Sequence, residues 1–188
     1  METEGLPGGA GRKYKRPSER AARFILEAFG WIRDIFTSST TFIPHGQVLQ
    51  HQGHYLPAGK KLRYPFILLV EDNPEIARKF IEAIEKYYHF GAVKILVAYA
   101  YDAAVTFFDT EDISLVIMDA ELEDEAGDGA TLVQKFIAVK PEITILANSS
   151  SRISNLKLTG YGALEALGKR TDKLTSWLKA NDPTGAEG

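Results

Sequence analysis

Short apolar runs alternate with stretches in which apolar residues recur every three or four positions, and this alternation begins near residue 65. The runs have the length and β-branched content of buried strands, although periodicity alone leaves a buried helix open for each of them. They cover residues 66–70, 93–98, 115–119, 143–147 and 163–167. The helical spacing covers residues 74–84, 102–108, 129–139, 152–158 and a last helix, capped by Thr171 or Asp172, that carries Leu174, Trp177 and Leu178. Alternating strands and helices predict an α/β fold, a doubly wound five-stranded parallel sheet with helices on both faces.

The chain before residue 65 does not show this alternation of strands and helices. Residues 1–17 are rich in glycine and basic residues, which predicts a disordered tail. Residues 18–64 read as an N-terminal helical extension from Glu19 to Phe36, followed by an irregular connector with room for one short strand pair. The helix carries a wide aromatic stripe, which predicts either packing on the neighbouring domain or a homodimer or partner surface. The folded domain then spans residues 65–180, and residues 181–188 read as a disordered tail.

Charge is divided unevenly along the chain. Residues 1–64 hold ten Lys and Arg against five Asp and Glu, whereas residues 65–188 hold twelve against twenty. The acidic second part argues against nucleic-acid binding there, and the basic N-terminal cluster is read as a solvated tail. The absence of cysteine fits a reducing compartment. No stretch has the length of a membrane span, and the N-terminus lacks an apolar signal core, so we expect a cytoplasmic protein without membrane contact.

Acidic residues stand where two of the predicted strands end. Glu71 and Asp72 follow the run 66–70, and Asp119 ends the run 115–119. Ligands of parallel sheets bind beyond the carboxyl ends of the strands. If these two strands are neighbours, three carboxylates meet at one edge, where their mutual repulsion calls for protons or a cation. Hard carboxylate oxygens suit Mg²⁺, so the pattern indicates a magnesium site, although any one of these acids could be a solvated loop residue.

The segment 66–180 resembles the receiver domain of two-component response regulators, whose CheY-like fold is flavodoxin-like with strand order 2-1-3-4-5. The matching residues are Leu69-Val70-Glu71-Asp72-Asn73, Met118-Asp119, Asp128-Gly129, Ile145-Leu146-Ala147-Asn148-Ser149, and Gly162-Ala163 leading to Lys169. The resemblance covers about two thirds of the chain. It implies a phosphoprotein of signal transduction that takes a phosphoryl group from a sensor histidine kinase or phosphotransfer protein.

The resemblance also implies a role for each matching residue. Asp119 would be the phosphoacceptor, and Glu71, Asp72, Asp119 and the backbone carbonyl of Glu121 would bind Mg²⁺. Ser149 would donate to a phosphoryl oxygen, and Lys169 would pair with the phosphoryl charge. Placing Ser149 in this role leaves Ala147, which cannot donate, as the other candidate. Two simpler alternatives remain open: Ser149 could cap the next helix, and Lys169 could be an ordinary surface lysine.

Several positions depart from the family pattern. Arg170 stands where the family has proline, Ala166 stands where it has an aromatic residue, and the loop between Asp119 and Asp128 is longer than usual. These departures favour a second hypothesis, a pseudo-receiver that is not phosphorylated and acts as an interaction module. A third, an aspartate-dependent phosphatase, needs Asp-x-Asp after the first strand, which Glu71-Asp72-Asn73 does not supply. We therefore expect no enzyme beyond a receiver that catalyses its own phosphorylation and dephosphorylation and signals by protein–protein contact.

Overall fold

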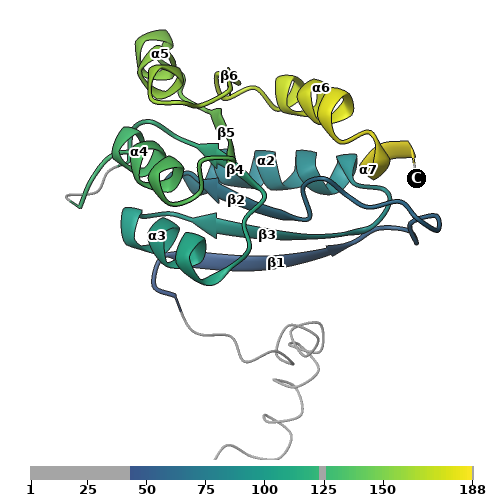
Figure 1. Ribbon diagram of the computed structural model, residues 1–188. Helices are drawn as coiled ribbons and strands as arrows, with labels where there is room; N and C mark the ends of the chain where they lie inside the picture. The colour runs from purple at the N-terminus through teal and green to yellow at the C-terminus, as the bar shows by residue number, and fades with distance from the viewer. Residues whose placement is uncertain (1–42, 123–125, 188) are drawn as a thin grey trace, which may run out of the picture. The chain divides into compact units, whose positions relative to one another are not determined.

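The computed structural model describes residues 43–122 and 126–187, which form a layered α/β unit (Figure 1). The strands are β1 (Gly46–Gln52), β2 (Phe66–Val70), β3 (Ala92–Ala98), β4 (Leu115–Met118), β5 (Thr144–Ala147) and β6 (Glu165–Ala166). The helices are α2 (Pro74–Tyr87), α3 (Tyr101–Thr110), α4 (Gly129–Val139), α5 (Arg152–Gly160), α6 (Thr171–Asn181) and α7 (Thr184–Glu187). The predicted disordered tail 1–17 and helix 19–36 lie outside the described residues.

One sheet runs through the unit in the order β1-β3-β2-β4-β5-β6. Strands β2 to β6 are parallel, and their order is the predicted 2-1-3-4-5. The α/β fold class is therefore confirmed. Strands β2 and β4 lie side by side at the centre, with Val70 opposite Met118, so the residues that follow these two strands emerge at the same edge.

Helices cover both faces of the sheet, and each face has its own apolar core. Alternate residues of β2, β3, β4 and β5 contribute to opposite cores, as the period of a strand requires. One core is completed by α3, α4 and α5, and the other by α2 and α6. Strands that are buried on both faces read as continuous apolar runs, which is why the sequence shows them so clearly.

Strand β1 is an addition to the expected five. It pairs antiparallel with β3 from Gly46 to Gln52 and lies within the predicted connector, which left room for a short strand pair but not for a strand of the main sheet. Only Val48 and Leu49 pack against the cores, because β1 is an edge strand whose three glutamines are exposed to solvent. Three glutamines and one histidine in seven residues make a weak strand signal. The folded unit therefore begins before the predicted boundary at residue 65.

The prediction of a disordered tail at residues 181–188 is wrong for the part that the structure describes, which ends at residue 187. Asp182 is buried, and one of its carboxylate oxygens accepts hydrogen bonds from the Tyr64 backbone N–H at 3.0 Å and the Tyr88 hydroxyl at 3.1 Å. The helical turn α7 follows. These partners lie about a hundred positions away in the chain, so the local sequence, polar and with one proline, looked like a tail. A smaller correction concerns α6, whose N-cap is Arg170 and whose first residue is Thr171.

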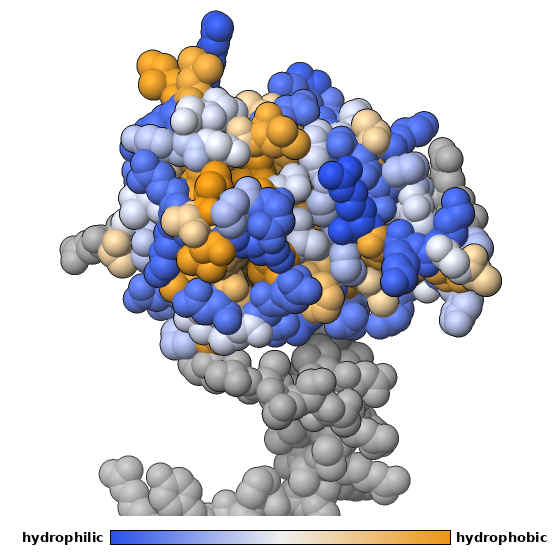
Figure 2. Space-filling model, viewed as in Figure 1, coloured by the Kyte–Doolittle hydropathy of each residue, from blue (hydrophilic) through white to orange (hydrophobic). Residues whose placement is uncertain are grey.

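The surface of the unit is mostly hydrophilic, but apolar side chains gather at the end that carries α5 (Figure 2). Four large apolar side chains in and after this helix are exposed, namely Ile153, Leu156, Tyr161 and Leu164. Among the described residues, no helix is long and apolar enough to cross a membrane.

Candidate functional site

Three strand ends deliver polar side chains to one edge of the sheet. The Asp119 backbone N–H donates to the Val70 carbonyl at 2.9 Å, and the Asn148 N–H donates to the Met118 carbonyl at 2.8 Å. The Glu71 N–H likewise donates to the Ala98 carbonyl at 3.0 Å, so the ladder continues for one residue beyond β2, β4 and β5. The site is therefore built at hydrogen-bonded strand ends, and such regular elements hold side chains more precisely than loops do.

The predicted meeting of three carboxylates is present at this edge. One carboxylate oxygen each from Glu71, Asp72 and Asp119 lies within 4.8 Å of the other two. Glu71 is fully buried and Asp119 is 4% exposed, while Asp72 lies at the rim. The helix α2 begins immediately after them, where Asn73 accepts hydrogen bonds from the N–H groups of Glu75 and Ile76. This cap with Pro74 in the first turn is as predicted.

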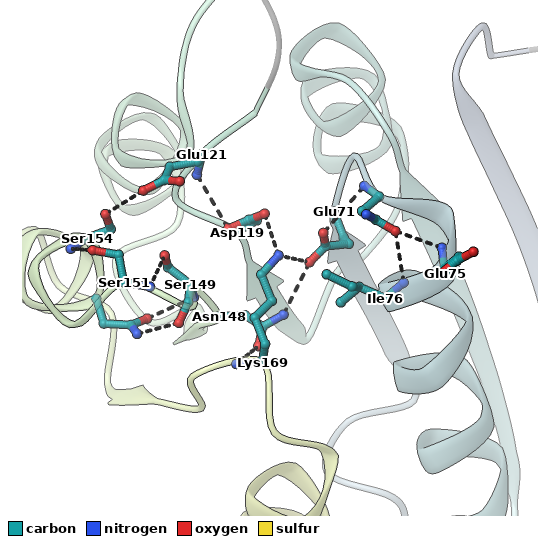
Figure 3. Close-up of polar contacts among 12 residues, drawn as sticks. Glu71, Glu75, Ile76, Asp119, Glu121, Asn148, Ser149, Ser151, Ser154 and Lys169 are labelled. Carbon is teal, nitrogen blue, oxygen red and sulfur yellow. Dashed lines mark hydrogen bonds and ion pairs between the residues drawn. The ribbon is translucent and has the colours of Figure 1, made fainter.

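Lys169 places its ammonium group between two of the carboxylates (Figure 3). Its Nζ donates to Asp119 Oδ2 at 2.6 Å and also to Glu71 Oε2. Lys169 follows β6, and its φ of 58° lies in the left-handed region, which costs a non-glycine residue about 1 kcal/mol. The surrounding contacts must therefore hold the backbone in a conformation that it does not favour by itself.

The donor set fits a magnesium ion. All three side chains offer hard carboxylate oxygens, and Lys169 supplies a single positive charge against three acidic groups. Mg²⁺ prefers such oxygens and keeps several waters, so two or three carboxylates suffice to hold it. The backbone carbonyl of Glu121 as a further ligand stays a prediction. The described contacts of Glu121 are its N–H to Asp119 at 3.4 Å and its carboxylate to the Ser154 hydroxyl at 2.8 Å.

No family model and no curated protein match the sequence. Solved structures match the fold. A two-component response regulator from Clostridium difficile covers 61% of this chain and 93% of its own, with 22% identity and a TM-score of 0.52. A CheY-like receiver domain protein from Methanospirillum hungatei JF-1 covers 66% and 99%, with 19% identity and a TM-score of 0.50. A chemotaxis protein from Vibrio cholerae covers 62% and 98%, with 15% identity and a TM-score of 0.52.

The chain has the fold of a response regulator receiver domain. The predicted resemblance is confirmed at the level of the fold, since identities this low speak for the fold alone. Asp119 lies at the carboxyl ends of the parallel strands, which is where open parallel sheets bind their ligands.

Burial changes the acidity of the carboxyl groups at this edge of the sheet. Burial raises the pKa of Glu71 to about 7, and the hydrogen bond from Lys169 opposes this rise. The pKa of Asp119 is also raised, again mainly by burial and again against the effect of Lys169. The repulsion expected between neighbouring acids contributes to the pKa of Glu71, but less than the loss of solvent does.

The loop after Asp119 returns to the site at the start of α4. Asp128 caps this helix by accepting a hydrogen bond from the Thr131 N–H at 2.8 Å. Gly129 follows, and its N–H donates to the Ala120 carbonyl at 3.1 Å. A Cβ at Gly129 would lie 1.7 Å from the carbonyl oxygen of Asp119, so only glycine fits there. The motif Asp128-Gly129 therefore serves as a cap and a close backbone contact.

Ser149 lies beside the site without reaching Asp119. It is buried, its Oγ accepts a hydrogen bond from the Ser151 N–H at 3.0 Å, and its backbone is held by the Asn155 side chain. Among the described contacts, none joins Ser149 to Asp119. The last residue of β5 is Ala147, the alternative position, and it has no donor. The role assigned to Ser149 stays a prediction that this arrangement does not favour.

Asn148 is a site residue that the sequence did not single out. It is fully buried and lies between Lys169 and Glu71 (Figure 3). It stands within the matched segment Ile145 to Ser149, directly after a buried strand, and an amide at such a position was the available signal. Of the departures from the family pattern, Arg170 forms an exposed ion pair with Asp172, and Ala166 leaves its place in β6 without an aromatic ring.

Proposed function

We propose that the chain is a phosphoaccepting receiver, in which Asp119 takes a phosphoryl group from a phosphohistidine of a sensor kinase or phosphotransfer protein. The observation that carries this proposal is the position of Asp119. Its carboxylate is nearly buried at the end of a central strand, 2.6 Å from the Lys169 ammonium and within 4.8 Å of two further acidic side chains. An acidic cluster with one fixed cation is suited to receive a metal ion and a phosphate group together.

The transfer requires a bond between an Asp119 carboxylate oxygen and phosphorus, while the bond from phosphorus to the histidine nitrogen breaks. The released imidazole keeps its electron pair and takes up a proton. Lys169 would hold its ammonium beside the transferred oxygens, and Glu71 and Asp72 would hold Mg²⁺. When bound, Mg²⁺ supplies the charge neutralisation that lets two anions approach. Phosphoryl transfer depends on such positioning and electrostatic stabilisation more than on covalent help from the protein.

The test is an intact-mass measurement after incubation with Mg²⁺ and a small phosphodonor such as phosphoramidate. We expect the mass of one phosphoryl group on the wild-type protein and none on Asp119→Asn, whose amide is a poor nucleophile of nearly the same shape. Asp128→Asn is the matched control, because Asp128 is an acid of the same edge that caps a helix. No labelling of the wild-type protein with a competent donor would contradict the proposal.

The second candidate is the pseudo-receiver, and one observation favours it. The Ser149 hydroxyl is engaged with the Ser151 backbone, and Ala147 ends β5, so no hydroxyl donor contacts Asp119 among the described residues. Labelling of Ser149→Ala, Ser150→Ala and Ser151→Ala separates the readings. A specific loss in Ser149→Ala shows that this hydroxyl turns toward the phosphoryl group.

Output by protein–protein contact is part of the same proposal. The exposed apolar side chains of α5 form a surface that a partner could cover (Figure 2). Residues 18–64 remain a second proposed association surface, now with β1 as part of the sheet. Beyond its own phosphorylation and dephosphorylation we propose no enzymatic activity, and we place this function in the cytoplasm.

A further inference from the structure

Asn148 contacts three parts of the site at once. Its backbone N–H donates to the Met118 carbonyl at 2.8 Å, one residue before Asp119. Its side-chain Oδ1 accepts from the Lys169 backbone N–H at 3.0 Å, and its Nδ2 lies 3.5 Å from Glu71 Oε2. An amide accepts through its oxygen and donates through its nitrogen, so a backbone N–H on one side and a carboxylate on the other fix the orientation of this side chain.

The burial of this amide gives its contacts energetic weight. Asn148 is 0% exposed, and a buried amide without partners costs about 1–3 kcal/mol. Both ends of the side chain face groups of the site instead of solvent. The site thus has a neutral, fully enclosed group that links the lysine loop to the metal-ligand candidate Glu71.

The backbone of Lys169 explains why such a link is needed. Gly168 and Lys169 both have positive φ, 68° and 58°, and the chain has no cis peptide bond among its described residues. A lysine in the left-handed region would relax into another conformation unless its backbone were held. The bond from its N–H to Asn148 and the bond from the Leu167 N–H to the Ala147 carbonyl at 2.7 Å fasten this turn to the end of β5.

We propose that Asn148 is a positioning residue that holds Lys169 and Glu71 in register with Asp119. It acts through these two side chains and does not touch the reacting atoms. Its effect on phosphorylation rests on the function proposed above, but its effect on the lysine turn and on the metal site does not. Asn148→Ala should weaken Mg²⁺ binding about 10- to 100-fold, as the loss of a group that orients metal ligands commonly does.

Asn155 provides a matched control for this change. It is also a buried asparagine of the same region, and its side chain also makes two hydrogen bonds, to the backbone N–H and carbonyl of Ser149 at 2.9 and 2.6 Å. It has no described contact with Glu71, Asp119 or Lys169. Asn155→Ala should therefore reduce stability to a similar degree while leaving the lysine turn and Mg²⁺ affinity unchanged.

The experiment follows the Lys169 amide by NMR in the metal-free full-length chain, and then Mg²⁺ titration and phosphoramidate labelling. In Asn148→Ala we expect amide exchange at Lys169 to be faster by roughly tenfold, from the loss of one hydrogen bond. Asn148→Asp keeps the acceptor for Lys169 and loses the donor toward Glu71. In Asn148→Asp the Lys169 amide should be as protected as in the wild-type protein, while phosphoramidate labelling should be slower than in the wild-type protein. If Asn148→Ala does not fold, Asn148→Asp alone provides the test.

The outcomes separate this inference from the proposed function. If the wild-type protein is not labelled but Asn148→Ala still alters the Lys169 amide and Mg²⁺ affinity, the phosphoacceptor role fails and the positioning role stands. If Asn148→Ala keeps wild-type protection, affinity and labelling, or if Asn155→Ala alters the Lys169 protection and the Mg²⁺ affinity equally, the positioning role is wrong.

Discussion

Replacement of Gly129 by alanine tests the close contact on which the position of Asp119 depends. The added Cβ would lie 1.7 Å from the Asp119 carbonyl oxygen, 2.8 Å from its carbonyl carbon and 3.0 Å from the Ala120 Cα. Carbon contacts are favourable at about 3.5 Å or more, so the two backbone segments must separate by roughly 2 Å. All three atoms belong to the backbone, and no side-chain rotation can relieve the overlap.

The expected cost follows from two contributions. Overpacking in a rigid core costs about 1–3 kcal/mol, and the upper part of this range applies because backbone must move. The hydrogen bond from Gly129 N–H to the Ala120 carbonyl would be strained or lost, at about 1 kcal/mol. A total near 3 kcal/mol or above lowers the melting temperature of a domain of this size by about 6–12 °C.

Thermal unfolding followed by circular dichroism is the assay, with Gly160→Ala as the matched control. Gly160 ends α5, and nothing lies within 4 Å of a Cβ placed on it. Its replacement should be neutral or stabilise the protein by up to about 1 kcal/mol through helix propensity. A Gly129→Ala protein within about 1 kcal/mol of the wild type would refute the inference that this glycine is required for space.

Three further predictions concern the carboxylates and the N-terminal boundary. Mg²⁺ should raise the melting temperature of the wild-type protein and leave Asp72→Ala unchanged, because Asp72 completes the acidic cluster; an equal response of both would place the metal elsewhere. Burial raises the pKa of Glu71 to about 7, so the folded state binds its proton more tightly than the unfolded state does. The free energy of unfolding without metal should therefore fall as pH rises from about 4.5 to 7, by at most about 3 kcal/mol, and urea titrations should show a smaller fall in Glu71→Gln. A chain that begins at Phe42 retains β1 and should keep labelling, whereas one that begins at Lys61 loses β1 and should unfold more easily; equal stabilities would mean that β1 adds nothing to the sheet.

The parallel strands and their helices could be predicted because their signals are local. Runs such as 66–70 and 115–118 are apolar on both faces, and the acids that follow them mark where each strand ends. The neighbouring positions of β2 and β4, and with them the meeting of Glu71 and Asp119, followed from the usual order of such sheets. The resemblance added Lys169, which periodicity could not have found. The sequence allows a short strand pair in the connector, but it does not place β1 in the main sheet, because an edge strand with a half-solvated face has few apolar residues.

The features that the sequence did not reveal share a physical cause. Asp182 and Asn148 are polar, stand in loops, and look locally like solvated residues. Each is buried because its partners come from far along the chain: Tyr64 and Tyr88 for Asp182, Glu71 and Lys169 for Asn148. The burial of apolar residues can be predicted from their periodic pattern in the sequence. The burial of a polar residue depends on a hydrogen-bond partner that only the fold brings close. Asn148 follows this rule at the edge that carries Asp119, because the fold brings Glu71 and Lys169 within hydrogen-bond distance of its buried side chain.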